Sequence, residues 1–310
     1  MAFDSLPRDR SYLLLWQSRS AVVIGKHQDA LAEIDRAYVE AEQIQVVRRL
    51  SGGGAVYHDL GDLNYSYITD APGGVLDLGR FCRPVLQALR AMGLPVELTG
   101  RNDMVLDGRK VSGSAQYVRQ GRVMHHGTLL FDTDLDKMAR ALRADPEKIR
   151  SKGVASVRSR VTLLRPALPE DMDMPQFRAR LLQELQRQLP GELMRFGAEE
   201  LRQIDALCRT RYGTWEWTFG ASPPCDQVLR RRFEGCGTVE ARLRLERGRI
   251  AALQFVGDFF SSVEPEELAA TLLGCPLEQD ALRAALSGTD VSRYLLGLDA
   301  ERLIALLCQG

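Results

Sequence analysis

Three glycine-rich polar segments hold the side chains that could do chemistry. The first, residues 48–59, reads RRLSGGGAVYHD, so two arginines and a serine surround the start of a triple glycine. Glycine lets the backbone approach a ligand closely, and successive N–H groups can bind an anion. Arginine binds phosphate and carboxylate oxygens well. The segment predicts an anion-binding loop, although a glycine-rich surface loop without a ligand would have a similar composition.

The other two segments follow at residues 100–115, GRNDMVLDGRKVSGSA, and residues 125–130, HHGTLL. Lys110 lies in the middle segment, where a lysine among glycines and serines favours a functional role over an exposed strand lysine. Of the four histidines, His58, His125 and His126 fall in these segments. Neighbouring residues of a strand point to opposite faces, so one of His125 and His126 at most can face a site. We expect that residue to be His126.

Taken together, the segments resemble those of the lipoate–protein ligase A family, in the same order and at similar separations. The resemblance continues at residues 152–161 and 215–220, so it covers most of the chain. It implies the fold shared with biotin–protein ligases and class II aminoacyl-tRNA synthetases. It also implies an ATP-dependent, AMP-forming ligase. Lipoate would be activated to lipoyl-AMP with release of pyrophosphate, and the lipoyl group would then pass to a lysine of an acceptor protein.

The resemblance implies a role for each matching residue. Lys110 is the expected catalytic residue, because its ammonium could bridge the lipoate carboxylate and the α-phosphate of ATP. Arg49 is expected to contact phosphate. The residues expected to bind ATP or lipoate are Arg49, Gly52, Gly53, Gly54, Ala55, Val56, Tyr57, His58, Asn102, Asp103, Lys110, Ser112, Gly113, His126, Gly127 and Thr128.

Some of these residues have a second interpretation. Asp103 and Asn102 offer hard oxygen ligands for Mg²⁺, and an Asx turn at the start of a strand would use the same residue types. His58 could contact the acyl chain, order the loop, or be a hydrogen-bonded structural histidine. The Gly-Asn that usually follows in the family is Gly61-Asp62 here, which adds a carboxylate that would repel phosphate.

Composition excludes several classes of protein. The chain has 310 residues, 45% of them hydrophobic, and a formal net charge of zero. Zero net charge argues against bulk electrostatic binding to nucleic acid or membranes, and no apolar run is long enough to span a bilayer. The six cysteines show no metal-site spacing, so we interpret them as free thiols. We expect a cytoplasmic monomer whose partners are apo lipoyl domains of E2 subunits and the glycine cleavage H protein.

Strand and helix patterns predict an α+β fold, with a mixed, largely antiparallel sheet flanked by helices and a small C-terminal accessory domain. We place the catalytic domain at residues 1–209 and the accessory domain at residues 214–310. Apolar spacing predicts helices over residues 29–43, 76–92 and 145–151, and a strand over 215–219. A hairpin is expected around Asp107-Gly108, just before Lys110.

Alternative functions remain open at this stage. The chain has only about eleven residues where the family usually carries a strand and a helix with Asn-Leu-Ala-x-Glu-Glu. This difference weighs for a non-catalytic lipoate-binding relative, whereas Arg49, Lys110 and the triple glycine weigh against one. A lipoyltransferase or octanoyltransferase would lack the activation step, and octanoyltransferases of this fold use a cysteine nucleophile. The only cysteine before Cys208 is Cys82, which we expect on a helix far from the glycine segments. That placement argues against thioester chemistry.

Overall fold

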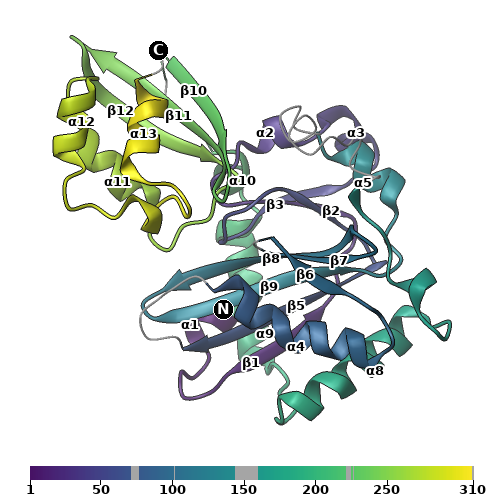
Figure 1. Ribbon diagram of the computed structural model, residues 1–310. Coiled ribbons are helices and arrows are strands. Elements are labelled where there is room, and N and C mark those ends of the chain that lie inside the picture. Colours follow the sequence, from purple (N-terminus) through teal and green to yellow (C-terminus); the bar gives the residue numbers. More distant parts are fainter. Residues whose placement is uncertain (71–76, 101, 144–159, 221–224, 226, 309–310) are drawn as a thin grey trace.

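The protein is described by a computed structural model over residues 1–70, 77–100, 102–143, 160–220, 225 and 227–308. Its main sheet has six strands, paired antiparallel throughout in the order β1-β5-β9-β8-β7-β6 (Figure 1). The strands are β1 (Tyr12–Trp16), β5 (Asp62–Asp70), β9 (Arg122–Leu130), β8 (Arg109–Arg119), β7 (Asp103–Leu106) and β6 (Glu97–Thr99). The expected antiparallel sheet is confirmed.

The two faces of this sheet differ in chemistry. One face, which we call the helix face, is covered by α4 (Leu78–Ala91) and α8 (Met174–Gln188). Tyr65 and Leu129 lie on it, in one apolar cluster with Leu89 of α4 and Phe177 of α8. Because side chains alternate along a strand, Asn64 and Ser66 point to the opposite face, together with their register partners Thr128 and His126. We call this opposite side the polar face.

A tight hairpin brings Lys110 to the start of β8. Asp107 and Gly108, between β7 and β8, both have positive φ, at 50° and 72°. Two successive residues of this kind make the type I′ turn that matches the twist of a β-hairpin. The hairpin predicted at these residues is confirmed.

A smaller sheet lies over the polar face, with the order β3-β2-β4. Its strands are β2 (Ala21–Ile24), β3 (Gln45–Arg48) and β4 (Val56–His58), and β2 pairs parallel with β3. The triple glycine connects β3 to β4. The prediction of one helix over residues 29–43 is wrong, because two short helices form there: α2 (Ala30–Glu33) and α3 (Arg36–Ala41). The side chain of Asp35 caps α3, and Ile34 is extended and bridges Leu142 just after α5 (Leu135–Ala141).

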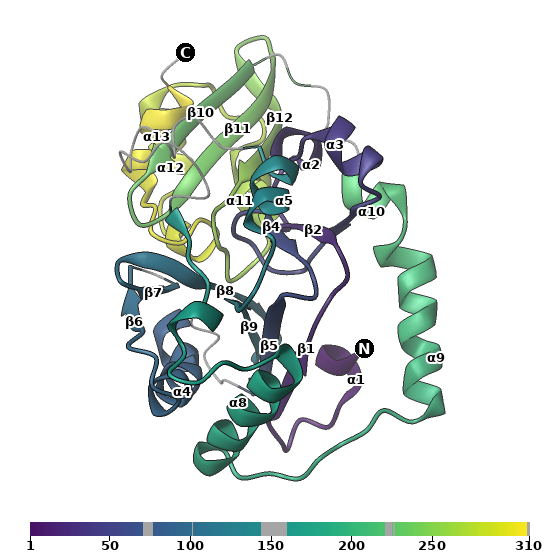
Figure 2. The ribbon, with the colours of Figure 1, turned by 90° about the vertical axis from the view of Figure 1, so that its right-hand side faces the viewer.

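The C-terminal part of the chain has its own sheet and core. Strands β10 (Gln227–Phe233), β11 (Gly237–Glu246) and β12 (Arg249–Gly257) form an antiparallel sheet. Its helices are α11 (Pro265–Leu272), α12 (Gln279–Ala285) and α13 (Ala300–Leu307), with the 3₁₀ turn η3 (Val291–Arg293). Their apolar side chains form one cluster with the sheet. Figure 2 shows this part beside the smaller sheet and above the main sheet.

Helical segments lead from α8 to the C-terminal part. They are α9 (Ala198–Leu207), the π-helical turn η2 (Cys208–Tyr212) and α10 (Trp215–Phe219). The predicted strand over residues 215–219 is therefore wrong. The Thr214 hydroxyl accepts a hydrogen bond from Trp217 N and starts the helix, and Trp217 Nε1 donates to the carbonyl of Arg48 at 2.9 Å. Two shorter elements complete the described chain: α1 (Ala2–Ser5) and η1 (Arg165–Ala167).

Several predictions fall on undescribed segments or concern the chain as a whole. The expected helix at residues 145–151, and most of the family-like segment at 152–161, lie outside the described residues. All six cysteines are free thiols, as expected. Within the described ranges, we find no helix with the length and apolarity to cross a membrane.

Candidate active site

Arg49 organises the first glycine-rich segment from inside. Its guanidinium donates to the carbonyl oxygens of Gly52 at 2.7 Å, Gly54 at 2.8 Å and Val23 at 3.0 Å. Its Nε donates to Ser51 Oγ at 3.1 Å. Burial lowers the pKa of Arg49 to about 10, so the side chain stays charged at neutral pH. In this structure the hydrogen bonds of Arg49 therefore go to the glycine-rich loop and to β2.

Ser51 links this segment to the third one. Its Oγ lies 2.6 Å from Nε2 of His126, on the polar face. Burial lowers the pKa of His126 well below its usual value, and the nearby charge of Arg49 lowers it further, so the imidazole is neutral. Since Arg49 donates to Ser51, we assign the serine hydrogen to the bond with His126. The expectation that His126, and not its neighbour, faces this side agrees with that geometry.

The glycines are in close contact with the C-terminal part. Gly53 N donates to the carbonyl of Phe259 at 3.1 Å. A Cβ on Gly52 would lie 2.3 Å from that same carbonyl oxygen, and one on Gly53, where φ is +90°, would lie 2.8 Å from the Phe260 ring. Only glycine permits this approach. Phe260 is 2% exposed and packs in one cluster with Ala115 of β8.

Lys110 lies on the polar face, near the start of β8. Its Nζ is 2.7 Å from Oδ1 of Asp103, and both side chains are partly exposed. A Cβ on Gly113 would meet Lys110 Nζ at 2.7 Å, so glycine makes room for the ammonium. Asn102 uses its side chain differently, because its Nδ2 donates to the carbonyl of Ser114 at 2.7 Å. Lys110 and Asp103 thus form one charged pair, while Asn102 fixes the strand start.

His58 is held by a buried carboxylate. Its Nδ1 is hydrogen-bonded to Oδ2 of Asp62, whose side chain is fully buried. Burial raises the pKa of Asp62. The carboxylate that departs from the family pattern therefore faces a histidine and not the glycine loop. Tyr57 precedes His58 on β4 and points into the core of the smaller sheet, where it is 2% exposed.

The structure places Ser112 and Gly127 on the side of the sheet opposite to Lys110 and His126. Ser112 is 1% exposed and lies against Tyr65, on the helix face. Gly127 is also on that face, where a Cβ would meet the Tyr65 ring at 2.5 Å. Thr128, by contrast, pairs with Asn64 on the polar face. Lys110, Gly113, His126 and Thr128 are thus brought to one side of the sheet.

Cys82 is nearer to the glycine-rich segments than the sequence suggests. Its Sγ lies 3.4 Å from Ser114 Oγ and 3.6 Å from His125 Nε2, so the expected separation is wrong. The thiol is nevertheless fully buried on the helix face, and burial raises its pKa. A nucleophile needs the thiolate and access to substrate. Burial of Cys82, and not its distance from the glycine-rich segments, therefore disfavours thioester chemistry.

Two aromatic residues near the site were missed from the sequence. Trp16, at the end of β1, is 37% exposed, donates to Ser66 Oγ at 3.0 Å, and has its ring 5.9 Å from that of His58. Phe260 reaches the glycines from 200 residues further along the chain. A tryptophan closing an apolar strand is the only signal that the sequence offered for Trp16. The contact of Phe260 is a property of tertiary packing.

Comparison with known proteins decides the family. Residues 2–186 match the model of the lipoyl protein ligase A/B catalytic domain, and residues 222–307 match that of the bacterial lipoate protein ligase C-terminus. The chain belongs to the lipoyl protein ligase A/B family. It is 36% identical to lipoate–protein ligase 1 of Staphylococcus aureus over 304 residues, which covers 98% of this chain and 92% of that protein. It is 37% identical to a lipoate–protein ligase of Bacillus subtilis over 306 residues, 97% of this chain and 92% of the relative.

Solved structures of this family are also similar. A lipoate–protein ligase A bound with ATP has a TM-score of 0.60 and 28% identity, covering 71% of this chain and 90% of that one. A bipartite ligase from Thermoplasma acidophilum, studied with its E2 lipoyl domain, has a TM-score of 0.62 and 29% identity, covering 73% and 90%. A P. falciparum protein in complex with lipoate has a TM-score of 0.73 and 18% identity, covers 97% and 87%, and supports the fold alone.

These findings confirm three predictions: the family, the fold class and a lipoate–protein ligase activity. The roles of individual residues and the domain boundary near residues 209–214 stay predictions.

Proposed function

We propose that this chain activates lipoate with ATP on the polar face of its main sheet, with Lys110 as the catalytic residue. The observation that supports this most directly is the position of Lys110, which lies above Gly113 and paired with Asp103. Ser51 and His126 lie on the same face. The lipoate carboxylate and the α-phosphate of ATP are both negatively charged, so a site that joins them needs a cation between them. It also needs glycines that let the backbone come close and neutral groups that form hydrogen bonds.

The reaction has two steps, activation of lipoate and transfer of the lipoyl group. A carboxylate oxygen of lipoate attacks the α-phosphorus of ATP, the bond to the bridging oxygen breaks, and pyrophosphate leaves. An acceptor lysine, as the free amine, then attacks the acyl carbon; AMP leaves and the amine loses a proton. Lys110 would reduce the repulsion in the first step and stabilise the negative charge on the acyl oxygen in the second.

The distance from Lys110 to Trp16 across the polar face is comparable to the length of an extended acyl chain. Gly113 lies on β8 and Trp16 on β1, with β9 and β5 between them. Three strand spacings of about 4.8 Å give roughly 14 Å between these points. A carboxylate beside Lys110 would therefore place the apolar end of an extended lipoate near the exposed ring of Trp16. Thr128, Asn64 and Ser66 border this path.

The phosphates of ATP would bind at the triple glycine. Gly53 N–H, a natural donor to phosphate, is bonded to Phe259 in this structure. Binding there thus requires the Phe259-Phe260 segment to withdraw. Such a displacement between steps would also give the acceptor lysine access to the acyl group.

Mg²⁺ and the acceptor protein belong to the proposal as well. Among the described residues, no group of three or more His, Cys, Asp or Glu side chains could hold a metal. Magnesium in nucleotide sites is commonly held by one or two carboxylates plus phosphates, so a single carboxylate such as that of Asp103 fits that role. The bound ion would supply neutralisation of phosphate charge. A lipoyl domain of an E2 subunit, the glycine cleavage H protein, a monomeric state and a cytoplasmic location stay predictions.

Lipoate-dependent release of pyrophosphate from Mg-ATP tests this assignment. We would assay the full chain, Lys110→Ala and Lys137→Ala, each with and without an apo lipoyl domain. Lys137 is a matched control, since it lies on α5 and pairs with Glu42 at 3.5 Å, away from the polar face. Lys110→Ala should lose most pyrophosphate release, and Lys137→Ala should retain it.

The other outcomes identify the rival functions. A wild-type chain that releases no pyrophosphate but lipoylates the acceptor from added lipoyl-AMP is a transferase. One that does neither is a binding relative. Equal losses in the two lysine variants would remove Lys110 from the catalytic role.

A further inference from the structure

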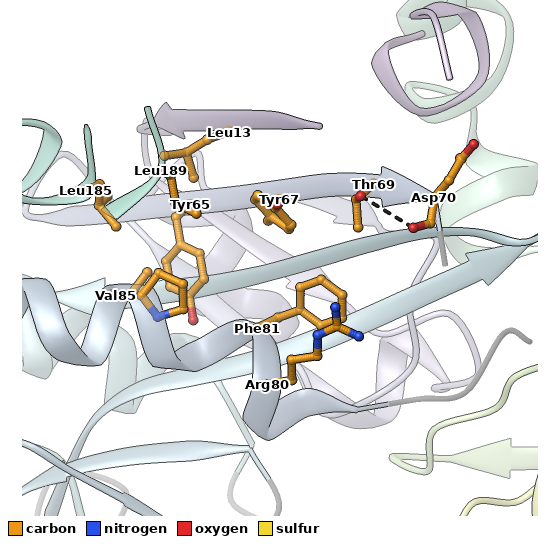
Figure 3. Close-up of a pocket in the computed structure, with 11 residues that line it drawn as sticks. Leu13, Tyr65, Tyr67, Thr69, Asp70, Arg80, Phe81, Val85, Leu185 and Leu189 are labelled. Carbon is orange, nitrogen blue, oxygen red and sulfur yellow. Dashed lines mark hydrogen bonds between the residues drawn. The ribbon is translucent and has the colours of Figure 1, made fainter. Parts of the chain in front are cut away.

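A cavity of about 290 Å³ lies on the helix face, on the side of the main sheet away from Lys110. Figure 3 shows its apolar end between the sheet and the two covering helices. That end is lined by Leu13, Tyr65, Tyr67, Val85, Leu185 and Leu189. Its volume is near the lower limit of small-molecule pockets, which span roughly 300–1,000 Å³. The volume and the apolar lining therefore suit a short apolar chain.

The other end of the cavity is polar and carries an uncompensated positive charge. Thr69, Asp70 and Arg80 line it, and Figure 3 shows Arg80 next to the Phe81 ring. Asp70 is neutralised, since its carboxylate lies 3.1 Å from Arg8 and 3.9 Å from Arg122. Arg80 has no ion pair among the described residues; its guanidinium carbon lies 5.6 Å from the centre of the Phe81 ring. Arg80 lies in the first turn of α4, whose N-terminus is capped by Asp77, and the Arg80 backbone N–H donates to that carboxylate at 2.9 Å.

We propose that this cavity binds an unbranched monocarboxylate of medium length, with its tail among Leu13, Val85 and Leu189 and its carboxylate at Arg80. Charge complementarity supports this ligand class, because the apolar end would take a hydrocarbon chain and the only unpaired charge among the described lining residues is positive. A neutral alcohol of the same length would satisfy the apolar end alone. A free fatty acid and a second molecule of an acyl substrate share this chemistry.

The site is distinct from the face that carries Lys110. Leu13 and Tyr67 are register partners on the helix face, whereas Leu14 pairs with Ser66 on the polar face. Tyr65 forms part of the wall, and its ring packs against Gly127 of β9. A ligand in this cavity would therefore contact β5 from the helix face. It would not reach the polar face, where we propose that lipoate is activated.

The test is a titration of octanoate into the full chain with labelled leucine and valine methyl groups, followed by NMR. Methyl signals of Val85 and Leu189 report the cavity, and those of Leu14 report the polar face. We expect saturable shifts at Val85 and Leu189. Across acids of four to eight carbons, affinity at these signals should rise about fourfold per methylene. Acids of twelve carbons and more should show no further gain in affinity, because the additional methylenes no longer fit in the cavity.

Three variants isolate the two ends of the site. Leu189→Trp fills the apolar end and should abolish the shift at Val85. Arg80→Gln should weaken octanoate about three- to fivefold and leave 1-octanol unaffected. Arg83→Gln is the matched control, an exposed arginine of the same helix that does not line the cavity, and should bind like wild type.

Shifts confined to Leu14, or no saturable shift at Val85, would overturn the proposal. So would equal effects of the two arginine substitutions, or equal losses of octanoate and octanol in Arg80→Gln. Lipoate as competitor separates the two sources of ligand: displacement of octanoate at Val85 identifies a second acyl-substrate site, and its absence identifies a fatty-acid site.

Discussion

Replacement of Phe260 by alanine should strengthen ATP binding. The Phe260 side chain is 2% exposed and lies against Gly53. The carbonyl of Phe259 accepts a hydrogen bond from Gly53 N–H. If ATP needs that N–H, the closed contact competes with ATP. The apparent dissociation constant is then the intrinsic value divided by the fraction of open molecules. Any substitution that weakens the closed contact raises that fraction.

The size of the effect follows from the packing lost. Phe→Ala in a packed environment costs about 3 kcal/mol or more, and here that cost falls on the closed arrangement. A change of 3 kcal/mol corresponds to roughly 100-fold in an equilibrium constant. The gain in ATP affinity should therefore lie between about threefold, if closed molecules only moderately outnumber open ones, and roughly 100-fold.

Equilibrium binding of ATP without lipoate measures this gain. Phe255→Ala is the matched control, because Phe255 is 4% exposed in the C-terminal core and is not among the residues that contact Gly52 and Gly53. It should destabilise the C-terminal part and leave ATP affinity unchanged. Unchanged or weaker ATP binding in Phe260→Ala would refute the competition, as would an equal gain in Phe255→Ala.

Three further changes have defined outcomes. Burial lowers the pKa of His125 to about 3, below its unfolded value, so its contribution to stability is complete above about pH 6.5 and is lost as the pH falls. The unfolding free energy of the wild-type chain should fall as the pH is lowered from about 6.5 to 5. In His125→Gln this fall should be smaller by about 2 kcal/mol, as measured by urea titration at each pH. Gly127→Ala should cost about 1–3 kcal/mol of unfolding free energy, because its Cβ meets the Tyr65 ring at 2.5 Å, and Tyr65→Leu in the same chain should restore part of it. Arg48→Lys should speed tryptic cleavage near η2, since Arg48 donates to the carbonyls of Trp217 and Thr218, whereas the exposed Arg36→Lys should not.

The sequence was sufficient where local chemistry decides structure. The turn at Asp107-Gly108 needs two residues that tolerate positive φ, and it was recognised from those residue types. The opposite directions of His125 and His126 follow from strand geometry alone. Such features depend on a few neighbouring residues, so no knowledge of the rest of the chain was needed.

The errors occur where distant contacts override the local pattern. Residues 215–219 alternate like a strand, but Thr214 caps a helix and Trp217 is anchored to the carbonyl of Arg48. The strand β10 was missed because Arg230, Arg231 and Arg232 hide its alternation. Cys82 was misplaced because α4 lies directly on the helix face, which sequence separation does not reveal.

Arg49 makes contacts in this structure that the sequence did not predict. Arginine before a triple glycine was expected to touch phosphate, yet its guanidinium holds the carbonyls of Gly52 and Gly54. In a trans peptide, the C=O and the following N–H point in opposite directions. Fixing the Gly52 carbonyl toward Arg49 therefore turns Gly53 N–H away from it, toward the position now taken by Phe259. Arg49 would thus serve an anion indirectly, by setting the direction of the donor and by adding a buried positive charge behind it.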